Sequence, residues 1–232
     1  RISKEADIPA EIYHLKASRK PNWKKIDDII KRVEEVRGQG LKITADIYTY
    51  NASSTGLTGV IPTWVQEGGH KAWIERMKDP NIRPRLLEDI RKELSEQPPE
   101  GILMVGFKTS EMSKKYLSKT VAEAAKMRGQ SPEEAIVDMV IEDDNRIQCI
   151  YFSMSEENIR KKIKLPWVSF CSDAGVYSDI TKNFRTHPRA FGSFVRVLGK
   201  YSRDENLFPL EEGIRRLTHF PASNLKLKNR GM

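Results

Sequence analysis

Residues 165–175 read LPWVSFCSDAG, an apolar run that ends in Ser172 and Asp173. Near the start of the chain, residues 12–16 read IYHLK and bring His14 and Lys16 to the end of another apolar run. Short apolar runs of this kind are typical of buried strands, and barrel enzymes keep their chemistry at the carboxyl ends of such strands. Most of the chain separates His14 from Asp173, so only a fold that gathers strand ends would bring the two together.

The composition is that of a globular protein. The chain has 232 residues, of which 38% are hydrophobic, and this is enough for a substantial core. No apolar run approaches the roughly 20 residues that cross a bilayer, and no signal-like leader is visible. We therefore expect a soluble protein with no membrane partner, in the cytoplasm rather than the periplasm. Because the chain starts and stops within recognisable elements, we interpret it as a segment of a longer protein, whose N-terminus could carry a targeting signal.

The charge is positive but dispersed. Forty Lys and Arg residues against 32 Asp and Glu residues give a net charge of +8. These charges are spread along helical stretches and do not gather into a basic face or an aromatic-basic repeat. Most are therefore expected to be solvated helix surface, and no nucleic-acid partner is predicted.

The first part of the chain, residues 1–50, shows the strand, helix, strand alternation that builds parallel sheets. A short strand is predicted at residues 10–15 and a second at residues 41–50. Between them, residues 23–36 carry apolar side chains at helical spacing, and glycines end the helix. The fold class predicted from this alternation is α/β.

Residues 51–148 do not look like a simple crossover. Helices are expected at residues 70–77, 83–94 and 120–128, another is capped by Ser131 with Pro132 at its first position, and residues 102–107 suggest a strand. An insertion this long between core strands predicts a lid or small subdomain. Residues 149–232 then resume the main fold, with strands at 148–153 and 165–172 and helices at 155–161, 190–203 and 209–218.

These motifs, in this order, resemble the N-acyl-D-amino-acid deacylases (D-aminoacylases) of the amidohydrolase superfamily. The resemblance covers nearly the whole chain and rests on motifs that are weak singly and specific together. They are HxK at 14–16, DxYxY at 46–50, ASST at 52–55, PxW at 62–64, EGG at 67–69, IYFSM at 150–154, SDAG at 172–175, HPR at 187–189, FGSF at 191–194 and RVLG at 196–199.

What the resemblance implies is a distorted (β/α)8, TIM-like barrel with a small attached β-sandwich. The chain would form the C-terminal part of the barrel, with a long and mostly helical insertion. The barrel would hold one or two Zn²⁺ ions at its C-terminal face. The family's His-x-His pair, bridging group and additional histidine would lie upstream of this segment, as would the N-terminal half of the barrel. The rest of the protein's own chain is thus an expected partner.

The resemblance assigns His14 as a metal ligand and Asp173 as an aspartate at the metal that accepts the proton of the attacking water. The chemistry fits, because zinc prefers imidazole nitrogen and carboxylate oxygen and lowers the pKa of bound water toward 7. A neighbouring aspartate can accept the proton of that water and pass it to the leaving amine. The residues alone leave alternatives open: His14 could be a structural histidine at a strand end, and Asp173 could be a helix cap.

Binding an acylated amino acid requires donors for its free carboxylate. Lys16 lies two residues beyond His14, on the same strand face, and Arg189 follows the final strand; both could instead be solvated charges. Tyr48, Ser54 and Tyr151 match positions that contact substrate in the family, although both tyrosines could simply pack in the core with a tethered hydroxyl.

Other kinds of site have little support. Cys149 and Cys171 lie in apolar contexts without C-x-x-C spacing and are expected to be buried thiols. No phosphate-binding glycine loop, G-x-S-x-G motif or Cys/His nucleophile arrangement is present. His70 and His219 lie at helix edges and are not expected to bind metal.

We therefore expect a zinc-dependent amide hydrolase that removes the acyl group from N-acyl-D-amino acids or related D-configured amides. The D configuration follows from the resemblance alone. A cyclic-amide hydrolase of the dihydroorotase type is the first alternative. The second is that the isolated segment is a non-catalytic fragment or scaffold, because half a barrel lacks part of its metal site and exposes strand edges.

Overall fold

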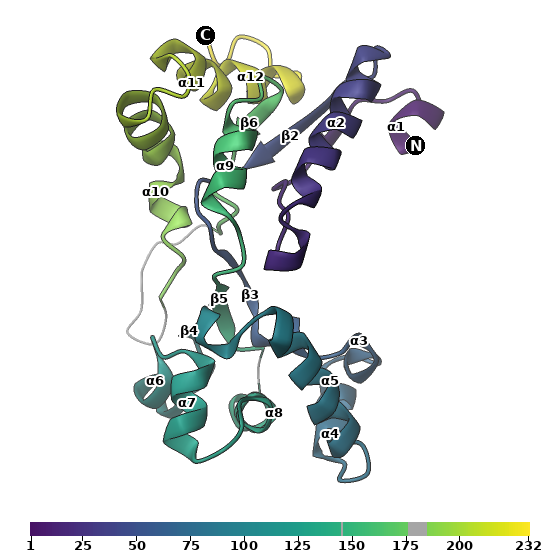
Figure 1. Cartoon of the computed structure of the whole chain (residues 1–232), viewed down its shortest axis with the longest axis vertical. Helices are drawn as coiled ribbons and strands as arrows, with labels where there is room; N and C mark the ends of the chain where they lie inside the picture. The colour runs from purple at the N-terminus through teal and green to yellow at the C-terminus, as the bar shows by residue number, and fades with distance from the viewer. Residues whose placement is uncertain (145, 176–184) are drawn as a thin grey trace. The chain divides into compact units, whose positions relative to one another are not determined.

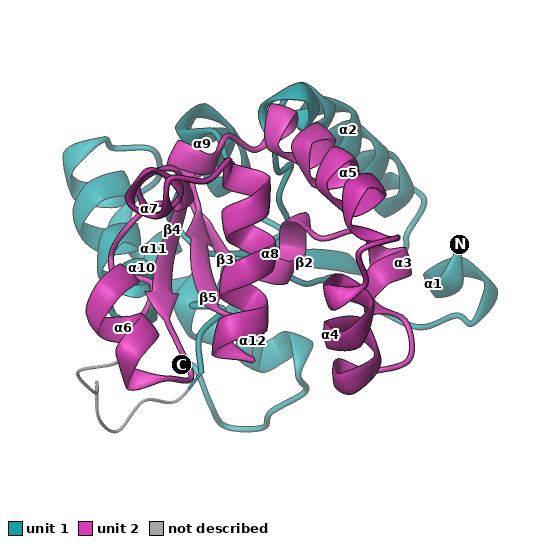
Figure 2. Ribbon diagram, turned by 90° about the horizontal axis from the view of Figure 1, so that it is seen from below, with its two compact units in different colours: residues 1–51, 154–176, 188–232 teal, residues 52–153, 177–187 magenta. Residues whose placement is uncertain are grey.

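The computed structural model describes residues 1–144, 146–175 and 185–232 (Figure 1). The chain divides into two compact units, coloured separately in Figure 2. Unit 1 comprises the described parts of residues 1–51, 154–176 and 188–232, and unit 2 those of residues 52–153 and 177–187. Unit 2 is therefore inserted into the sequence of unit 1.

Unit 1 is built on a parallel sheet of three strands, β1 (Ala10–Ile12), β2 (Ile43–Ile47) and β6 (Val168–Phe170), in the order β1-β2-β6. Ile12 pairs with Ala45, and Ile47 pairs with Phe170, so the carboxyl ends of the three strands lie at one edge. This arrangement brings together the two stretches at residues 12–16 and 165–175, as the sequence predicted.

The helices of unit 1 bury an apolar stripe against this sheet. In α2 (Lys25–Gly38) the apolar residues recur at helical spacing, and Ile26 and Val33 are buried. Helix α9 (Glu156–Ile163) buries Ile159 and Ile163 in the same core. The remaining helical elements are α1 (Ile2–Glu5), η1 (Lys20–Asn22), α10 (Arg189–Arg196), the π-helix η4 (Val197–Asp204), α11 (Leu210–Leu217) and α12 (His219–Asn224).

The two faces of the parallel sheet differ in chemistry. Ala45, Ile47, Val168 and Phe170 belong to the buried core of unit 1. The alternate residues are polar: Glu11 pairs with Thr44, and Asp46 pairs with Ser169. These four line a cavity of about 470 Å³ that is also bounded by residues of α12. Parallel sheets are ordinarily covered on both faces, so a second face with polar residues and a cavity between it and α12 is a distinctive feature of this unit.

Unit 2 contains an antiparallel sheet in the order β3-β5-β4, formed by β3 (Ser53–Gly56), β5 (Gln148–Tyr151) and β4 (Ile102–Gly106). Its core is a cluster of buried apolar side chains from the sheet and the helices. The helical elements are η2 (Leu57–Val60), α3 (Thr63–Gln66), α4 (His70–Lys78), α5 (Arg83–Glu96), η3 (Pro99–Gly101), α6 (Ser110–Tyr116), α7 (Val121–Arg128) and α8 (Pro132–Asp143).

Local sequence signals fix several of these helix ends. Ser131 and Glu134 form a capping box at the start of α8, with Pro132 at the first helical position, as predicted. Thr120 and Glu123 form a second capping box at α7, which ends at Gly129 in the left-handed conformation.

The structure differs from the predicted domain division at one strand. We expected residues 148–153 to resume the main fold, but β5 is the central strand of the antiparallel sheet in unit 2. The insertion therefore extends to Ser153 and includes a sheet as well as helices. The apolar run of β5 indicates a buried strand correctly, but it carries no information about which neighbours the strand pairs with.

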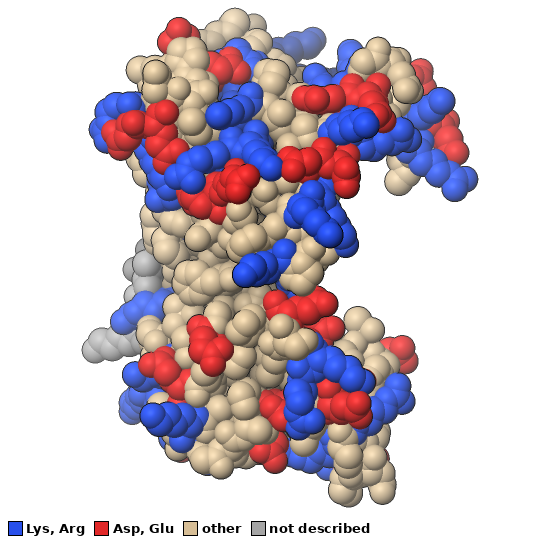
Figure 3. Space-filling model, viewed as in Figure 1, with Lys and Arg blue, Asp and Glu red and all other residues tan. Residues whose placement is uncertain are grey.

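The charged side chains are intermixed on the face shown in Figure 3, where Lys and Arg lie beside Asp and Glu. Opposite charges also form ion pairs, such as Arg160–Glu205 and Lys161–Asp27. None of the helices in the described ranges combines the length and the apolar composition that a membrane crossing needs. Both thiols, Cys149 (buried) and Cys171 (half-buried), are free.

Candidate active site

Five of the seven predicted site residues lie in unit 1, at the carboxyl edge of the parallel sheet or on the helix that follows it. His14 and Lys16 follow β1, Tyr48 follows β2, and Asp173 follows β6. Arg189 is the first residue of α10 and forms an ion pair with Asp173, with Nη1 and Oδ2 2.7 Å apart. The fold thus links side chains that come from four separate stretches of sequence.

The backbone at His14 is held in an unusual conformation. Its φ of +40° lies in the left-handed region, which is uncommon for a residue with a side chain. Its N–H donates to Asp46 Oδ1 at 2.7 Å, and the next N–H, of Leu15, donates to the Asp46 carbonyl at 2.8 Å. Lys162 Nζ donates to the Leu15 carbonyl at 2.7 Å. These bonds hold the turn that ends β1, and they fix the backbone position from which the His14 side chain extends.

Asp173 shares this backbone feature, with a φ of +47°. Beside the ion pair with Arg189, its Oδ1 accepts a long hydrogen bond of 3.5 Å from the Tyr13 hydroxyl. Non-glycine residues in sparsely populated backbone conformations persist where the surroundings hold them, and they concentrate at functional sites. Two such residues, at the ends of the two outer strands of the same sheet, mark this edge as a candidate active site.

Tyr48 lies between the two candidate cations. Its ring centroid is 4.6 Å from the Arg189 guanidinium carbon and 5.4 Å from Lys16 Nζ, within the range of cation–π attraction. The side chain is buried, and burial raises the pKa of the Tyr48 hydroxyl despite the opposing charge of Arg189. The ring is therefore a neutral platform against which both cations are arranged.

The lysines near this edge are partly or wholly withdrawn from water. Burial lowers the pKa of Lys16, whose ammonium donates to the His14 carbonyl at 3.1 Å; Asp173 opposes that shift and Arg189 adds to it. Burial lowers the pKa of Lys162 further, to about 7, with a contribution from the charge of Lys16. Burial also raises the pKa of the nearby Cys171 thiol, so the thiol stays protonated at neutral pH.

Ser54 and Tyr151 lie in unit 2, on the paired strands β3 and β5. Ser54 Oγ donates to the Cys149 carbonyl at 2.9 Å. Tyr151 belongs to the buried core of unit 2, and its hydroxyl donates to the Gly56 carbonyl at 2.8 Å. These contacts match the packing alternative for Tyr151, a core ring with a tethered hydroxyl.

Two of the described side chains have the donor types of a metal site. His14 and Asp173 offer the imidazole and carboxylate that zinc prefers. In the described part of the chain, however, no group of three or more His, Cys, Asp or Glu side chains is arranged to hold a metal ion. The donor types fit zinc, but these residues alone do not complete a ligand set.

Three residues at this edge were not among the predicted site residues. Asp46 was noted only for its place in a family motif, yet its carboxylate holds the His14 turn. The sequence signal for Asp46 is an acidic residue between the apolar residues Ala45 and Ile47, near the carboxyl end of a strand. The sequence gives no such signal for Lys162 or Thr49. Lys162 resembles the other surface lysines of a helix, and Thr49 resembles an ordinary strand residue.

A parallel sheet with a histidine and an aspartate at its carboxyl edge has the donor types that the class of metal-dependent hydrolases uses. The comparisons with known proteins narrow this class, although no family model matches the chain. The chain is 26% identical over 231 residues to a D-aminoacylase, and 27% identical over 230 residues to an N-acyl-D-glutamate deacylase, both from Alcaligenes xylosoxydans xylosoxydans. The predicted resemblance to the N-acyl-D-amino-acid deacylases is thereby confirmed.

Solved structures agree. The chain aligns over 99% of its length with an N-acyl-D-glutamate deacylase from Bordetella bronchiseptica in complex with zinc and a phosphonate inhibitor, with a TM-score of 0.72 and 23% identity. It aligns over its full length with a D-aminoacylase studied for its binuclear metal center, with a TM-score of 0.70 and 26% identity. The alignments span 38% of each sequence relative and 39% of each of these structures. The α/β fold is thus that of the D-aminoacylase structures.

Proposed function

We propose that this chain is the C-terminal part of the catalytic barrel of a zinc-dependent hydrolase that removes the acyl group from N-acyl-D-amino acids. The observation that carries the proposal is the set of His14, Lys16, Tyr48, Asp173 and Arg189 at the carboxyl edge of one parallel sheet. The similarity to deacylases over the whole chain supports it. Those relatives do not favour the cyclic-amide alternative.

The open polar face of the β1-β2-β6 sheet supports the barrel. Glu11, Thr44, Asp46 and Ser169 line a cavity on this face, and parallel sheets are ordinarily covered on both sides. Further strands of the full-length protein would close this face into a (β/α)8 barrel. Unit 2, inserted between β2 and β6, would form the predicted lid or small subdomain.

His14 would be one ligand of the zinc ion, and the remaining ligands would come from the rest of the protein's chain. Zinc, when bound, activates a water molecule at neutral pH and polarises the scissile carbonyl. Asp46 fixes the turn on which His14 sits, which limits the directions that the imidazole can take.

Asp173 would move the proton of the reaction. It accepts the proton of the attacking water as the water oxygen bonds to the carbonyl carbon, and it donates that proton to the amine nitrogen as the carbon–nitrogen bond breaks. The products are a carboxylic acid and a free amino acid. The ion pair with Arg189 and the contact with Tyr13 orient the carboxylate for both transfers.

Arg189 and Lys16 would bind the substrate's carboxylate. Arginine has five N–H donors in a fixed plane, so Arg189 can hold Asp173 through one nitrogen and a substrate carboxylate through another. Both cations are positioned against the Tyr48 ring. Because Arg189 is nearly fully buried, water screens its attraction for a carboxylate less than at the surface, and this attraction offsets the cost of removing water from the carboxylate.

The test is hydrolysis of a panel of N-acetyl-D- and N-acetyl-L-amino acids by the full-length protein and its Asp173→Asn variant, with bound zinc measured for both. We expect turnover of D substrates by the parent, and a loss of roughly a thousandfold or more in kcat for a variant that still binds zinc. A variant that retains its turnover would remove Asp173 from the mechanism. A parent that cleaves none of these amides would remove the proposed activity.

A further inference from the structure

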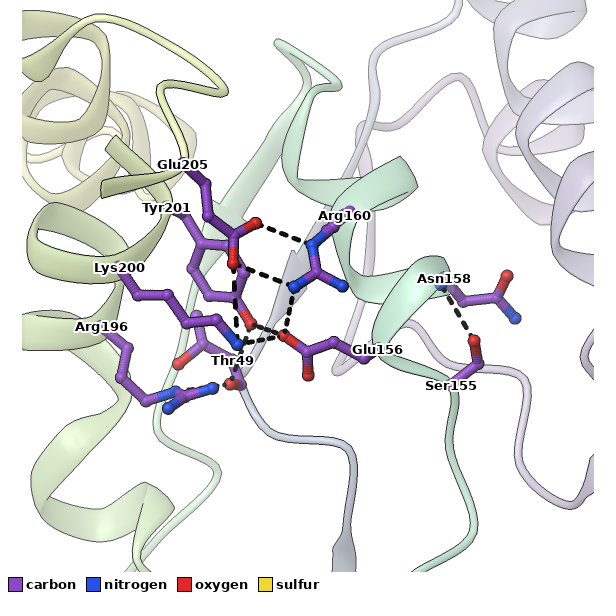
Figure 4. Close-up of polar contacts among 9 residues, drawn as sticks. All are labelled: Thr49, Ser155, Glu156, Asn158, Arg160, Arg196, Lys200, Tyr201 and Glu205. Atoms are coloured by element: carbon purple, nitrogen blue, oxygen red, sulfur yellow. Dashed lines mark hydrogen bonds and ion pairs between the residues drawn. The ribbon is translucent and has the colours of Figure 1, made fainter. Parts of the chain in front are cut away.

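The structure contains a polar network behind the candidate active site that the proposed chemistry does not use. It consists of Thr49, Glu156, Arg160, Arg196, Lys200, Tyr201 and Glu205, and Figure 4 shows it at the junction of β2, α9 and η4 in unit 1. Thr49 is fully buried and directly follows Tyr48. The network is therefore joined to the candidate active site through the peptide bond between Tyr48 and Thr49.

One face of α10 is turned toward the end of β2. Arg189, Ser193 and Arg196 are spaced four and three residues apart and so share a face of the helix. Arg189 lies over the Tyr48 ring, Thr49 Oγ1 donates to the Ser193 carbonyl at 3.0 Å, and Arg196 Nε donates to the Thr49 carbonyl at 3.0 Å. Two hydrogen bonds to one buried residue thus set how far along β2 the helix lies.

The π-helix η4 reinforces this contact. In a π-helix, each residue is hydrogen-bonded to the fifth residue along the chain. Arg196 and Tyr201 are five residues apart, and both side chains lie near the Thr49 carbonyl. The Tyr201 hydroxyl lies 3.5 Å from the Thr49 carbonyl and 2.8 Å from Glu156 Oε1. A hydroxyl has a single proton, so Tyr201 donates it to Glu156, the nearer acceptor. Arg196 is therefore the principal donor to the Thr49 carbonyl.

Glu156 ties this arrangement to α9. Its Oε1 accepts from Lys200 as well as from Tyr201, and Arg160 on the next turn of α9 binds Glu205 in a bidentate ion pair at 2.7 and 2.9 Å. Burial raises the pKa of Glu156, but the bonds from Lys200 and Tyr201 outweigh this and leave it lowered. An ionised Glu156 therefore holds η4 on α9.

We propose that Thr49 and Arg196 are positioning residues that set the spacing between Arg189 and the Tyr48 ring, and through it the strength with which the site binds the substrate's carboxylate. Neither residue touches the substrate. The inference rests on the proposed function, because it concerns the carboxylate that Arg189 is proposed to hold.

The experiment uses the full-length protein and two substrates, an N-acetyl-D-amino acid and its uncharged carboxamide. In Thr49→Val the hydroxyl is lost and the shape is kept. We expect the KM for the carboxylate substrate to rise roughly tenfold and the KM for the carboxamide to stay within about twofold of the parent. Because Arg189 also pairs with Asp173, any loss in kcat should be the same for both substrates. Thr49→Ser should restore the parent values, and Arg196→Met should repeat the Thr49→Val pattern. Arg203→Met, which alters an exposed cation of the same η4 segment, is the matched control.

The outcomes separate this inference from the proposed function. If Arg189→Met leaves the KM for the carboxylate substrate unchanged, the carboxylate site itself is wrong. If Arg189→Met raises that KM and Thr49→Val does not, only the positioning role fails. An equal rise in KM for both substrates would show a merely structural role and would also overturn the inference. Should Thr49→Val not fold, Arg196→Met carries the same test.

Discussion

Replacing Lys162 should change how the stability of the protein depends on pH. The side chain is 3% exposed, and its pKa is lowered from 10.5 to about 7, first by burial and then by the charge of Lys16. Each unit of depression corresponds to about 1.4 kcal/mol, so the cost of holding the charged amine in the folded state is at most about 5 kcal/mol. The hydrogen bond to the Leu15 carbonyl offsets part of that cost.

The sign follows from proton binding. Between pH 7 and 10.5 the unfolded chain keeps the Lys162 proton while the folded protein has released it, so stability rises with pH in this window. Below pH 7 both states are protonated, and the full cost is present. Relative to a Lys162→Met variant, the parent should therefore gain up to about 1.4 kcal/mol per pH unit, or roughly 2.5 kcal/mol from pH 7.5 to 9.5.

The assay is urea unfolding of the full-length parent and the variant at intervals of half a pH unit. Lys161→Met is the matched control, because this neighbouring lysine is exposed and its pKa is raised by its hydrogen bond to Asp27. The stability difference for the control should show no such rise. A difference between parent and Lys162→Met that stays constant from pH 7.5 to 9.5 would refute the reasoning and show that Lys162 stays charged in the fold.

Two further substitutions test packing around the sheet of unit 1. Arg216 is buried and donates to the carbonyls of Val168 and Ile163 at 2.6 Å. Urea unfolding of Arg216→Met should therefore show a loss of about 3 kcal/mol in the free energy of unfolding. The control variant Arg215→Met should lose under about 0.5 kcal/mol. A Cβ at Gly192 would collide with the Tyr50 hydroxyl, so Gly192→Ala should lower the melting temperature by several degrees and Tyr50→Phe should restore much of the loss; no rescue would contradict the contact.

Much of the fold could be predicted because its signals are local. The caps of α7 and α8 depend on residues within one turn, and the apolar spacing of α2 matches the stripe that it buries. The strands were harder to delimit. Strand β1 ends at Ile12, shorter than predicted, because the left-handed backbone at His14 interrupts it, and no residue pattern reports such a turn.

Most contacts between distant parts of the chain could not be predicted from the sequence. Residues 148–151 and 168–170 are both short apolar strands, yet one pairs antiparallel in unit 2 and the other parallel in unit 1. The π-helix η4 was predicted as a simple continuation of α10, since five-residue and four-residue bonding patterns leave similar sequence traces. His14 and Asp173 stood out by their places after apolar runs, and the family resemblance assigned their roles. Those roles stay predictions, as does the compartment of the protein.

The insertion of unit 2 between β2 and β6 has a consequence for the order in which the protein folds. The antiparallel sheet of unit 2 forms within the single stretch of residues 52–153, whereas the pairing of β2 with β6 must wait until all of that stretch has been synthesised. Closing a long loop costs entropy, and an already compact insert lowers that cost by bringing its two ends together. If the sheet within residues 52–153 forms first, the pairing of Ser53 with Tyr151 would shorten the loop that closes when β2 pairs with β6.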